Sequence, residues 1–276
     1  MIEEYYDESV LNGVPAPTMT QCQARGNGIW VEVDGKGECL SYWSAGLTEA
    51  TPCAVFFIHG DRLWDGKVVG YSDNRSSIQR ESAARAAASI GMPLVKIARP
   101  GLYGSSGSHS ASRQMRELQL VAAAAREIIK RYNIRRYGFA GQSGGGSVVA
   151  YLIPQFPDAE CFAFTAACLS LQKASGYDYG AHGIYDPIAH ISEVEPRSHR
   201  RLFIIGDERD KWAPFSNLVE FYEAAQQGGH DVTLVRCEAL RNHVLDATGQ
   251  DTVAWVLQGI SSSEIARRIL ARGINN

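Results

Sequence analysis

The stretch RYGFAGQSGGGSVVAYL, residues 136–152, places four glycines and a serine between two apolar segments. The flanks are typical of buried elements, a short strand before the glycines and a helix after them. A flexible linker is polar on both sides, so these flanks argue against a linker. The glycines therefore form a tight turn within a folded domain, and Ser143 lies at that turn.

Two phosphate-binding loops do not fit this turn. A Walker loop needs GxxxxGK[ST], and no lysine follows the glycines. A dinucleotide fingerprint needs GxGxxG, whereas Gly138, Gly141 and Gly144 are spaced GxxGxxG. The pattern that remains is G-x-S-x-G, from Gly141 to Gly145. A strand that turns at once into a helix strains the residue at the apex and requires glycine two positions on either side. The alternative is a glycine turn whose serine is only structural.

Strand-like and helical patterns alternate along most of the chain. The run CAVFFIHG, residues 53–60, has the continuous apolar character of a strand buried on both faces of a parallel sheet. Further strands are expected in 93–101, 135–141, 160–168, 201–207 and 231–237, with helices in 76–91, 111–132, 145–154, around 215–222, around 253–260 and after 261–264. This order predicts an α/β fold with an open, mostly parallel sheet and helices on both faces.

The ends and interruptions of this pattern define the expected domain organisation. Residues 28–46 predict a hairpin, because Asp34-Gly35 favours a tight turn. Residues 1–27 have no clear periodicity and are expected to form an N-terminal lead-in, and residues 171–200 break the alternation as a short cap or lid. With no linker and no internal repeat, residues 1–276 are predicted to form a single domain.

Composition excludes several other classes of protein. The formal net charge of −3 gives no broad attraction to nucleic acid or to an anionic membrane. The acidic start MIEEYYDESV lacks the features of a signal peptide, and no apolar run reaches the roughly 18 residues of a membrane span. We therefore expect a cytoplasmic protein with no nucleic-acid and no membrane partner, although a secreted protein that has lost its signal would look the same.

The cysteines give no sign of a metal cluster. They have no CxxC spacing, and we expect them to be buried free thiols in a reducing cytoplasm. The six are Cys22, Cys39, Cys53, Cys161, Cys168 and Cys237.

Four segments together resemble the α/β-hydrolase family. They are GQSGGG, FFIHG, ARPGLYGSSG and GDERDKWAP, and the pattern of elements extends the resemblance over about residues 30–260. The resemblance implies the α/β-hydrolase fold with Ser143 as nucleophile at a strand–turn–helix elbow. It also implies that an acid and then a histidine follow Ser143 along the chain, and that no metal or organic cofactor is needed.

The general base is expected to be His243. Only two of the seven histidines, His230 and His243, follow the strand that should carry the acid. His230 lies between a helix and the next strand, which places it at the amino ends of the strands. His243 comes after a strand and before a helix, at the carboxyl ends, where the serine also lies.

The acid is expected just after the strand at residues 201–206. Asp207, Glu208 and Asp210 all lie there. The segment GDERDKWAP resembles the family pattern that gives the role to Asp210, and Asp207 remains the alternative. A buried carboxylate would hold the imidazole tautomer and stabilise the imidazolium.

The oxyanion hole implied by the resemblance pairs the N–H of Gly144 with that of Asp61. A carboxylate at Asp61 would oppose an oxyanion unless it pointed away or was paired, for instance with Arg62; it could also bind a cationic substrate group. Arg99 could bind a substrate carboxylate or brace its loop. Candidate substrate-binding residues are Arg99, Tyr103, Trp64 and Trp212, and the aromatics Tyr177, Tyr179 and Tyr185 lie in the expected cap.

These observations favour a serine hydrolase of carboxylic esters or related acyl compounds, acting through a Ser143–His243–Asp210 triad on a small-molecule acyl substrate. A serine peptidase or amidase of small peptides is the first alternative. It is disfavoured because acylaminoacyl and dipeptidyl peptidases usually carry a large extra domain. The second alternative is a non-catalytic binding protein of the same fold. The sequence leaves a homo-oligomer open.

Overall fold

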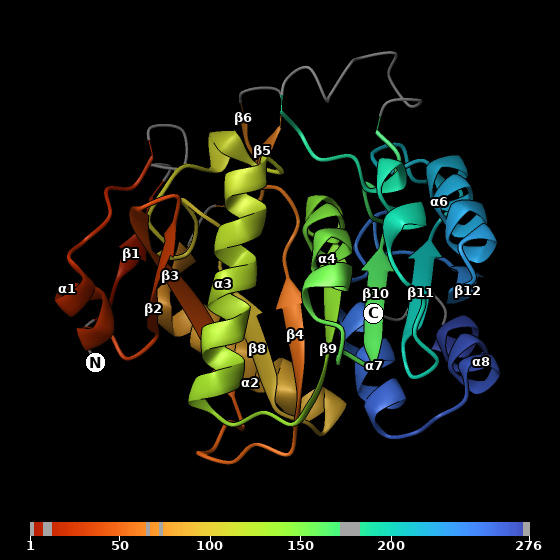
Figure 1. Cartoon of the computed structure of the whole chain (residues 1–276), viewed down its shortest axis with the longest axis horizontal. Helices are drawn as coiled ribbons and strands as arrows, with labels where there is room; N and C mark the ends of the chain where they lie inside the picture. The colour runs from red at the N-terminus through yellow and green to blue at the C-terminus, as the bar shows by residue number, and fades with distance from the viewer. Residues whose placement is uncertain (1–2, 8–12, 65–66, 72–73, 172–182, 273–276) are drawn as a thin grey trace. The chain divides into compact units, whose positions relative to one another are not determined.

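The computed structural model describes residues 3–7, 13–64, 67–71, 74–171 and 183–272. Figure 1 shows alternating strands and helices, and the main sheet has eight strands in the order β12-β11-β10-β9-β4-β8-β3-β2. This mixed, mostly parallel sheet flanked by helices confirms the α/β fold class. The chain forms two compact units, each described separately below: Met1–Pro52 with Asp61–Arg135, the first unit, and Cys53–Gly60 with Arg136–Asn276, the second unit.

The second unit contains five strands, and each pairs in parallel with its neighbour. Parallel strands covered on both faces need continuous apolar runs, and nearly all residues of the four strands other than β12 are buried. In sheet order the strands are β12 (Asp231–Arg236), β11 (Arg201–Gly206), β10 (Cys161–Thr165), β9 (Arg136–Gln142) and β4 (Cys53–Ile58).

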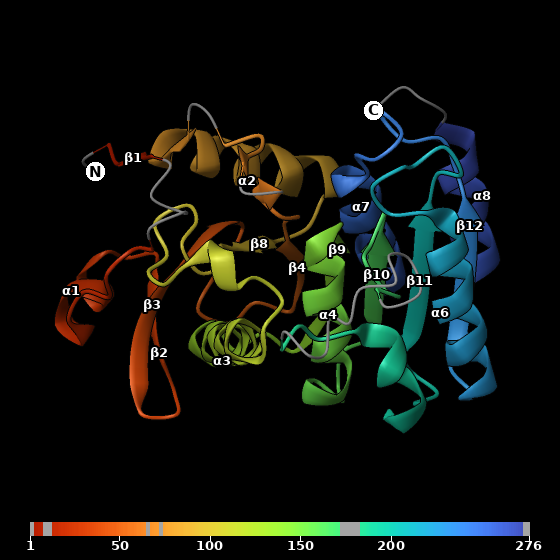
Figure 2. The same cartoon turned by 90° about the horizontal axis from the view of Figure 1, so that it is seen from above.

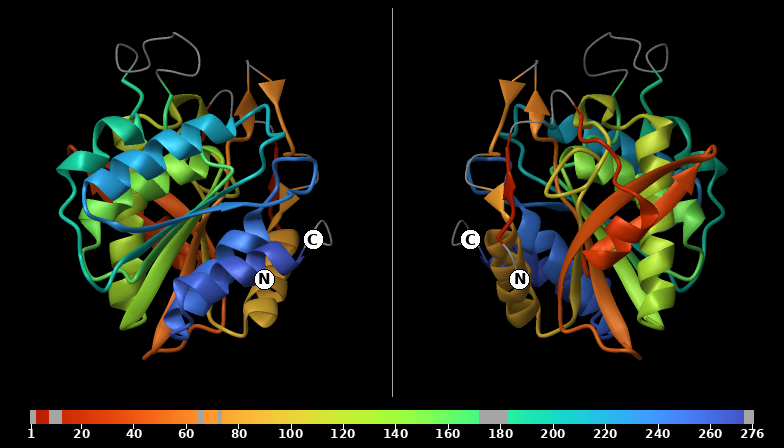
Figure 3. Two further views of the ribbon diagram at one scale, coloured as in Figure 1. Left: turned by 90° about the vertical axis from the view of Figure 1, so that its right-hand side faces the viewer. Right: turned by 90° about the vertical axis from the view of Figure 1, so that its left-hand side faces the viewer.

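Within the described part of this unit, four helices cover these strands. In Figure 2, α4 and α6 lie on one face of the strands, and α7 and α8 lie on the other. The left view of Figure 3 shows α6 and the C-terminal helices on opposite sides of the same strands. The helices are α4 (Gly144–Gln155), α6 (Phe215–Gln227), α7 (Asp246–Leu257) and α8 (Ser262–Arg272), with 3-10 turns η4 (Pro187–Ala189) and η5 (Ile191–Glu193).

Among the described residues, the first unit contributes three strands to the main sheet, and these pair antiparallel with one another. Asp34 and Gly35 join two of them with φ of 52° and 70°, which confirms the predicted hairpin turn. Figure 2 shows α2 and α3 on opposite faces of β3 and β8. The elements are β2 (Gly28–Val33), β3 (Lys36–Ala45), β8 (Leu94–Ile97), α1 (Met19–Ala24), α2 (Ser76–Ile90), α3 (Met115–Arg131) and η2 (His109–Ala111), with the two-residue strands β1 (Tyr5–Tyr6), β5 (Leu63–Trp64), β6 (Lys67–Val68) and β7 (Asn74–Arg75).

The segments expected as lead-in and cap are only partly within the described residues. The lead-in, 1–27, contains β1 and α1, and α1 begins at a capping box formed by Thr18 and Gln21. Residues 172–182 of the expected cap, with Tyr177 and Tyr179, lie outside the described residues. Among the described residues, none of the helices combines the length and the apolar character that a membrane span requires.

A disulfide between Cys22 and Cys39 corrects the prediction that all six cysteines are free thiols. The bond joins α1 to β3 across 17 residues of sequence, so no local spacing indicated it. Disulfides persist in oxidising compartments and are rare in the cytosol, so the bond favours an oxidising environment over the expected cytoplasm. Free cysteines are found at Cys53, Cys161, Cys168 and Cys237.

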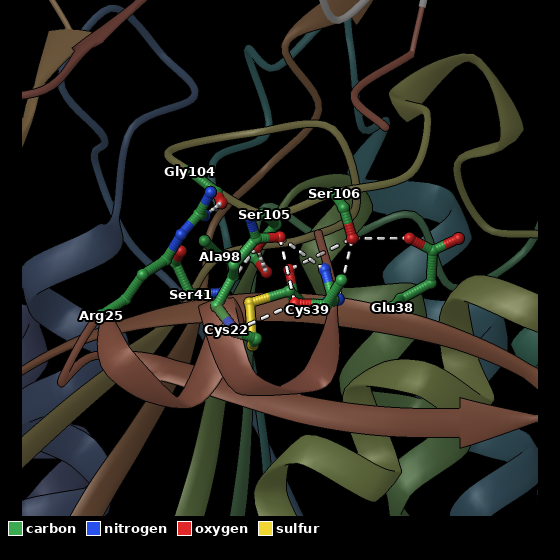
Figure 4. Close-up of a disulfide and its surroundings, with 11 residues drawn as sticks. Cys22, Arg25, Glu38, Cys39, Ser41, Ala98, Gly104, Ser105 and Ser106 are labelled. Carbon is green, nitrogen blue, oxygen red and sulfur yellow. Dashed lines mark hydrogen bonds between the residues drawn. A yellow bond between two sulfur atoms is a disulfide. The ribbon is translucent and has the colours of Figure 1, made fainter. Parts of the chain in front are cut away.

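Figure 4 shows that the strand carrying this disulfide also holds a serine-rich loop. The backbone N–H of Cys39 donates to Ser106 Oγ at 2.8 Å, and that of Ser41 donates to Ser105 Oγ at 2.9 Å. Ser105 in turn donates to the carbonyl of Ala98 at 2.8 Å. The disulfide therefore anchors α1 to the strand that fixes the loop after β8.

We expect the double variant Cys22→Ser/Cys39→Ser to lose about 3 kcal/mol of unfolding free energy, because the closed loop no longer restricts the unfolded chain. Urea unfolding measures the loss, and Cys53→Ser is the control for a free cysteine. Alkylation in denaturant should modify four cysteines before reduction and six after it. Six modified cysteines before reduction would contradict the disulfide.

Candidate active site

The turn between β9 and α4 has the geometry of a strained elbow. Its apex, Ser143, has φ of 53° and ψ of −125°. A Cβ on Gly141 would lie 2.5 Å from the carbonyl oxygen of Gly145, and a Cβ on Gly145 would lie 2.4 Å from that of Ile58 and 2.5 Å from that of His59. Real side chains do not approach backbone so closely, so both positions require glycine. The elbow thus packs directly on the end of β4.

Close contacts continue around the serine itself. A Cβ on Gly60 would lie 3.0 Å from Ser143 Cβ and 3.7 Å from its Oγ, and one on Gly146 would lie 2.3 Å from Ala167 Cβ. The backbone N–H of Ser143 donates to the carbonyl of Thr165 at 2.9 Å. The third consecutive glycine, which the motif does not require, is therefore explained by packing against the segment after β10.

Asp210 and His243 lie together in the second unit. Oδ2 of Asp210 is 2.7 Å from Nδ1 of His243. The other oxygen accepts backbone N–H groups from Trp212 at 2.8 Å and Ala213 at 3.1 Å, which fixes the direction of the buried carboxylate. An ionised carboxylate only accepts, so Nδ1 carries the proton and Nε2 of a neutral ring is left as an acceptor.

Asp207, the alternative acid, makes a different set of contacts. Its carboxylate accepts two hydrogen bonds from the Arg209 guanidinium, at 2.7 and 2.9 Å, and one from the backbone N–H of Ala239 at 2.8 Å. The hydrogen bond from Arg209 lowers the pKa of Asp207 to about 2. Asp207 therefore organises its own loop. His230 lies directly before β12, at the amino end of that strand.

Gln142 joins the elbow to the segment that carries His243, and no sequence pattern singled it out. Its Nε2 donates to the carbonyl oxygen of His243 at 2.7 Å, and its Oε1 accepts the N–H of Leu245 at 3.0 Å. Gln142 directly precedes Ser143, so these bonds bring the histidine segment to the residue beside the serine. The motif leaves position 142 open, which is why the pattern did not indicate it.

A group of buried charges surrounds Asp61 in the first unit. Arg99 has no exposed surface, and it contacts Asp61 at 2.7 Å and Glu117 at 2.8 and 2.9 Å. Arg113 lies 3.6 Å from the second oxygen of Asp61. Burial raises the pKa of Asp61, but Arg113 and Arg99 outweigh it and hold this pKa well below its usual range. The carboxylate is thus paired with these two arginines, and not with Arg62 as suggested by the sequence.

His109 supports the same region as a neutral side chain. Its Nε2 accepts the backbone N–H of Arg62 at 3.0 Å, so this nitrogen is unprotonated. Burial, reinforced by the nearby charge of Arg99, lowers the pKa of His109 to about 4. The side chain therefore supports the loop after Asp61 without adding a charge at neutral pH.

The expected substrate-binding residues have very different surroundings. Arg99 is buried and forms ion pairs with Asp61 and Glu117, contacts that favour a structural role in its loop. Tyr103 is buried too; it receives a 2.7 Å hydrogen bond from Arg62 and lies beside Tyr71, with ring centroids 5.1 Å apart. Trp212 is 57% exposed. Trp64 lies in β5, and its side chain is outside the described part of the chain.

Comparison with known proteins shows similarity in structure but not in sequence. No family model and no curated protein matches the chain. The esterase Pf2001 of Pyrococcus furiosus is 14% identical, with a TM-score of 0.60 over 96% of this chain and 100% of that one. Est1E of Butyrivibrio proteoclasticus, solved with ferulic acid, is 15% identical, with a TM-score of 0.53 over 75% and 88%.

A peptidase has the same fold over part of its length. The acylaminoacyl peptidase of Pyrococcus horikoshii is 15% identical, with a TM-score of 0.53 over 76% of this chain and 36% of that one. The order of the strands, the elbow and these similarities agree, and the chain has the α/β-hydrolase fold.

Proposed function

We propose that this chain is a serine hydrolase that cleaves a carboxylic ester or related acyl bond through an acyl-enzyme. The observation that carries the proposal is the bridge made by Gln142. It connects the strained elbow of Ser143 to the main chain of His243, whose ring is hydrogen-bonded to Asp210. These contacts support a triad in which Ser143 is the nucleophile, His243 the general base and Asp210 the acid of acyl transfer.

In the proposed reaction, Ser143 Oγ attacks the acyl carbonyl while His243 Nε2 takes the hydroxyl proton. Asp210 stabilises the imidazolium that forms. The tetrahedral intermediate collapses as the bond to the leaving group breaks, and His243 gives its proton to the departing alcohol. Water, deprotonated by His243, then attacks the acyl-enzyme, and the acid leaves as Ser143 regains its proton.

The oxyanion is proposed to bind the N–H groups of Gly144 and Asp61. Gly144 is the first residue of α4, where the amide groups have no partner within the helix. The amide nitrogen of Asp61 is bonded to Gly60, whose Cα borders Ser143. Because Arg99 and Arg113 pair with the Asp61 carboxylate, its charge is compensated, which removes the main objection to Asp61 in this role.

Ester hydrolysis is preferred to peptide hydrolysis because of the lengths of the similar proteins. The esterase Pf2001 is matched over its whole length, whereas the acylaminoacyl peptidase is matched over 36% of its own. The test compares p-nitrophenyl esters with aminoacyl p-nitroanilides. Turnover of esters is expected, and turnover of the anilides alone would favour the peptidase.

Ser143→Ala should abolish covalent labelling by a fluorophosphonate probe and lower kcat by about 10⁴-fold or more, because no other group can form the acyl-enzyme. Intact mass and active-site labelling measure the outcome. Ser263→Ala, on the exposed side of α8, is the matched control and should label as the wild type does. Equal labelling of Ser143→Ala and the wild type would show that Ser143 is not the nucleophile.

Gly60→Ala should lower kcat/KM by about 10- to 100-fold, because the new methyl group would lie 3.0 Å from Ser143 Cβ and displace the nucleophile. The control is Gly228→Ala, where the nearest atoms lie 3.3 Å or more from a new Cβ. Steady-state kinetics on a p-nitrophenyl ester, with urea unfolding of both variants, checks this. Unchanged kinetics in Gly60→Ala would contradict the packing at the elbow.

Arg99→Met should lower the free energy of unfolding by about 3–5 kcal/mol, because Glu117 and Asp61 would lose a buried partner. The loss of unfolding free energy in Arg99→Lys should be smaller, since lysine keeps the charge but cannot make the bidentate contact with Glu117. Urea unfolding measures the loss of stability. A raised KM at unchanged stability would instead support a substrate carboxylate as the partner of Arg99.

A further inference from the structure

The carboxamide of Gln142 is buried and almost fully used. The residue is 5% exposed. Besides the bonds to His243 and Leu245, Oε1 accepts the hydroxyl of Thr165 at 3.1 Å. The reverse orientation of the amide would face its oxygen toward the carbonyl of His243 and its NH₂ toward the N–H of Leu245, so the partners fix the orientation. Gln142 therefore presents one donor and one acceptor to the histidine segment in a fixed direction.

The bonds of Gln142 to the carbonyl of His243 and to the N–H of Leu245 lie on either side of Val244. Gln142 therefore restrains the main chain of the histidine segment at both of these residues. The segment has other features that require such support. Arg241 and Asn242, directly before His243, have φ of 53° and 61°. This left-handed conformation is less favourable for residues that carry a side chain than for glycine. Ala239 and Leu245 are buried, but Leu240 and Val244 are 44% and 39% exposed, so apolar burial holds the ends of the segment more than its middle.

His243 is thus held at its ring, at its carbonyl oxygen and at its N–H, which donates to the carbonyl of Leu240 at 3.1 Å. Asp210 binds the ring at Nδ1, and Gln142 binds the carbonyl of the same residue. A carboxylate at one ring nitrogen leaves the ring free to move with its backbone, and the bond to the carbonyl restrains that backbone. Because Gln142 is covalently bonded to Ser143, this restraint couples the position of the His243 main chain to that of Ser143.

We propose that Gln142 is a positioning residue of the reaction, which sets the distance between His243 and Ser143 by holding the main chain at residues 243 and 245. The inference rests on the proposed hydrolase function. It assigns no contact with substrate to Gln142. Its role is exerted on the proton transfer from serine to histidine, where an error of about 1 Å can lower the rate by about 100-fold.

The test uses Gln142→Met, which fills the same space without either hydrogen bond. We expect kcat on a p-nitrophenyl ester to fall by about 10- to 100-fold with KM unchanged, because substrate binding does not involve the amide. The rate of fluorophosphonate labelling at Ser143 should fall by a similar factor. Gln142→Glu keeps the acceptor for Leu245 and replaces the donor to His243 by a carboxylate oxygen that repels the carbonyl, so it reports on the carbonyl bond should the methionine variant fail to fold.

Thr252→Val is the matched control for loss of a buried hydroxyl in the second unit. Thr252 donates to the carbonyl of Thr248 at 2.7 Å within α7, and its loss should lower Tm slightly while kcat stays as in the wild type. Two results would overturn the positioning role. One is a wild-type kcat in both Gln142 variants. The other is an equal fall in kcat in Thr252→Val when its Tm matches that of the Gln142 variant. Wild-type protein that resists labelling would instead overturn the hydrolase function.

Discussion

The close approach of backbone to backbone at the elbow governs the arrangement of the candidate site. The turn from β9 into α4 brings Gly145 against the carbonyl oxygens of Ile58 and His59, with no room for a side chain. A strained residue such as Ser143 costs on the order of 1–3 kcal/mol, and persists only where the surroundings fix it. Here the surroundings are buried strands paired in register on both sides of β9, so their burial offsets the strain.

Buried charges fix a second part of the candidate site, the loop that begins at Asp61. Burying one carboxylate or one guanidinium alone would be very unfavourable, and the first unit buries them as a group. Arg99 contacts both Asp61 and Glu117 with its guanidinium, and it lies at the start of the serine-rich loop held by β3. The disulfide, the serine loop and the charge group therefore form one continuous support, all within the first unit.

The alternation of strands and helices, the hairpin at Asp34-Gly35 and the glycines of the elbow could be predicted because each depends on neighbouring residues. Topology placed His243 and the acids after β11 at the carboxyl ends of the strands, and the family resemblance selected Asp210, which is hydrogen-bonded to His243. The disulfide and the bond of Gln142 to His243 could not be predicted. They join residues 17 and 101 positions apart, and a pairing at such a distance leaves no periodic pattern in a single sequence.

The register of the parallel strands explains why these distant residues meet. Ile58 of β4 pairs with Gly141 of β9, so Gly60, two residues past the first, comes to lie against Ser143, two residues past the second. Thr165 at the end of β10 pairs with Gln142, which explains why the Thr165 hydroxyl donates to the amide oxygen of Gln142. Since side chains alternate along a strand, a shift of one residue in either pairing would turn the partner away. The geometry at Ser143 is thus a consequence of strand register. Gln142, the last residue of β9, is placed by the same register, and its hydrogen bonds position the main chain of His243 and Leu245.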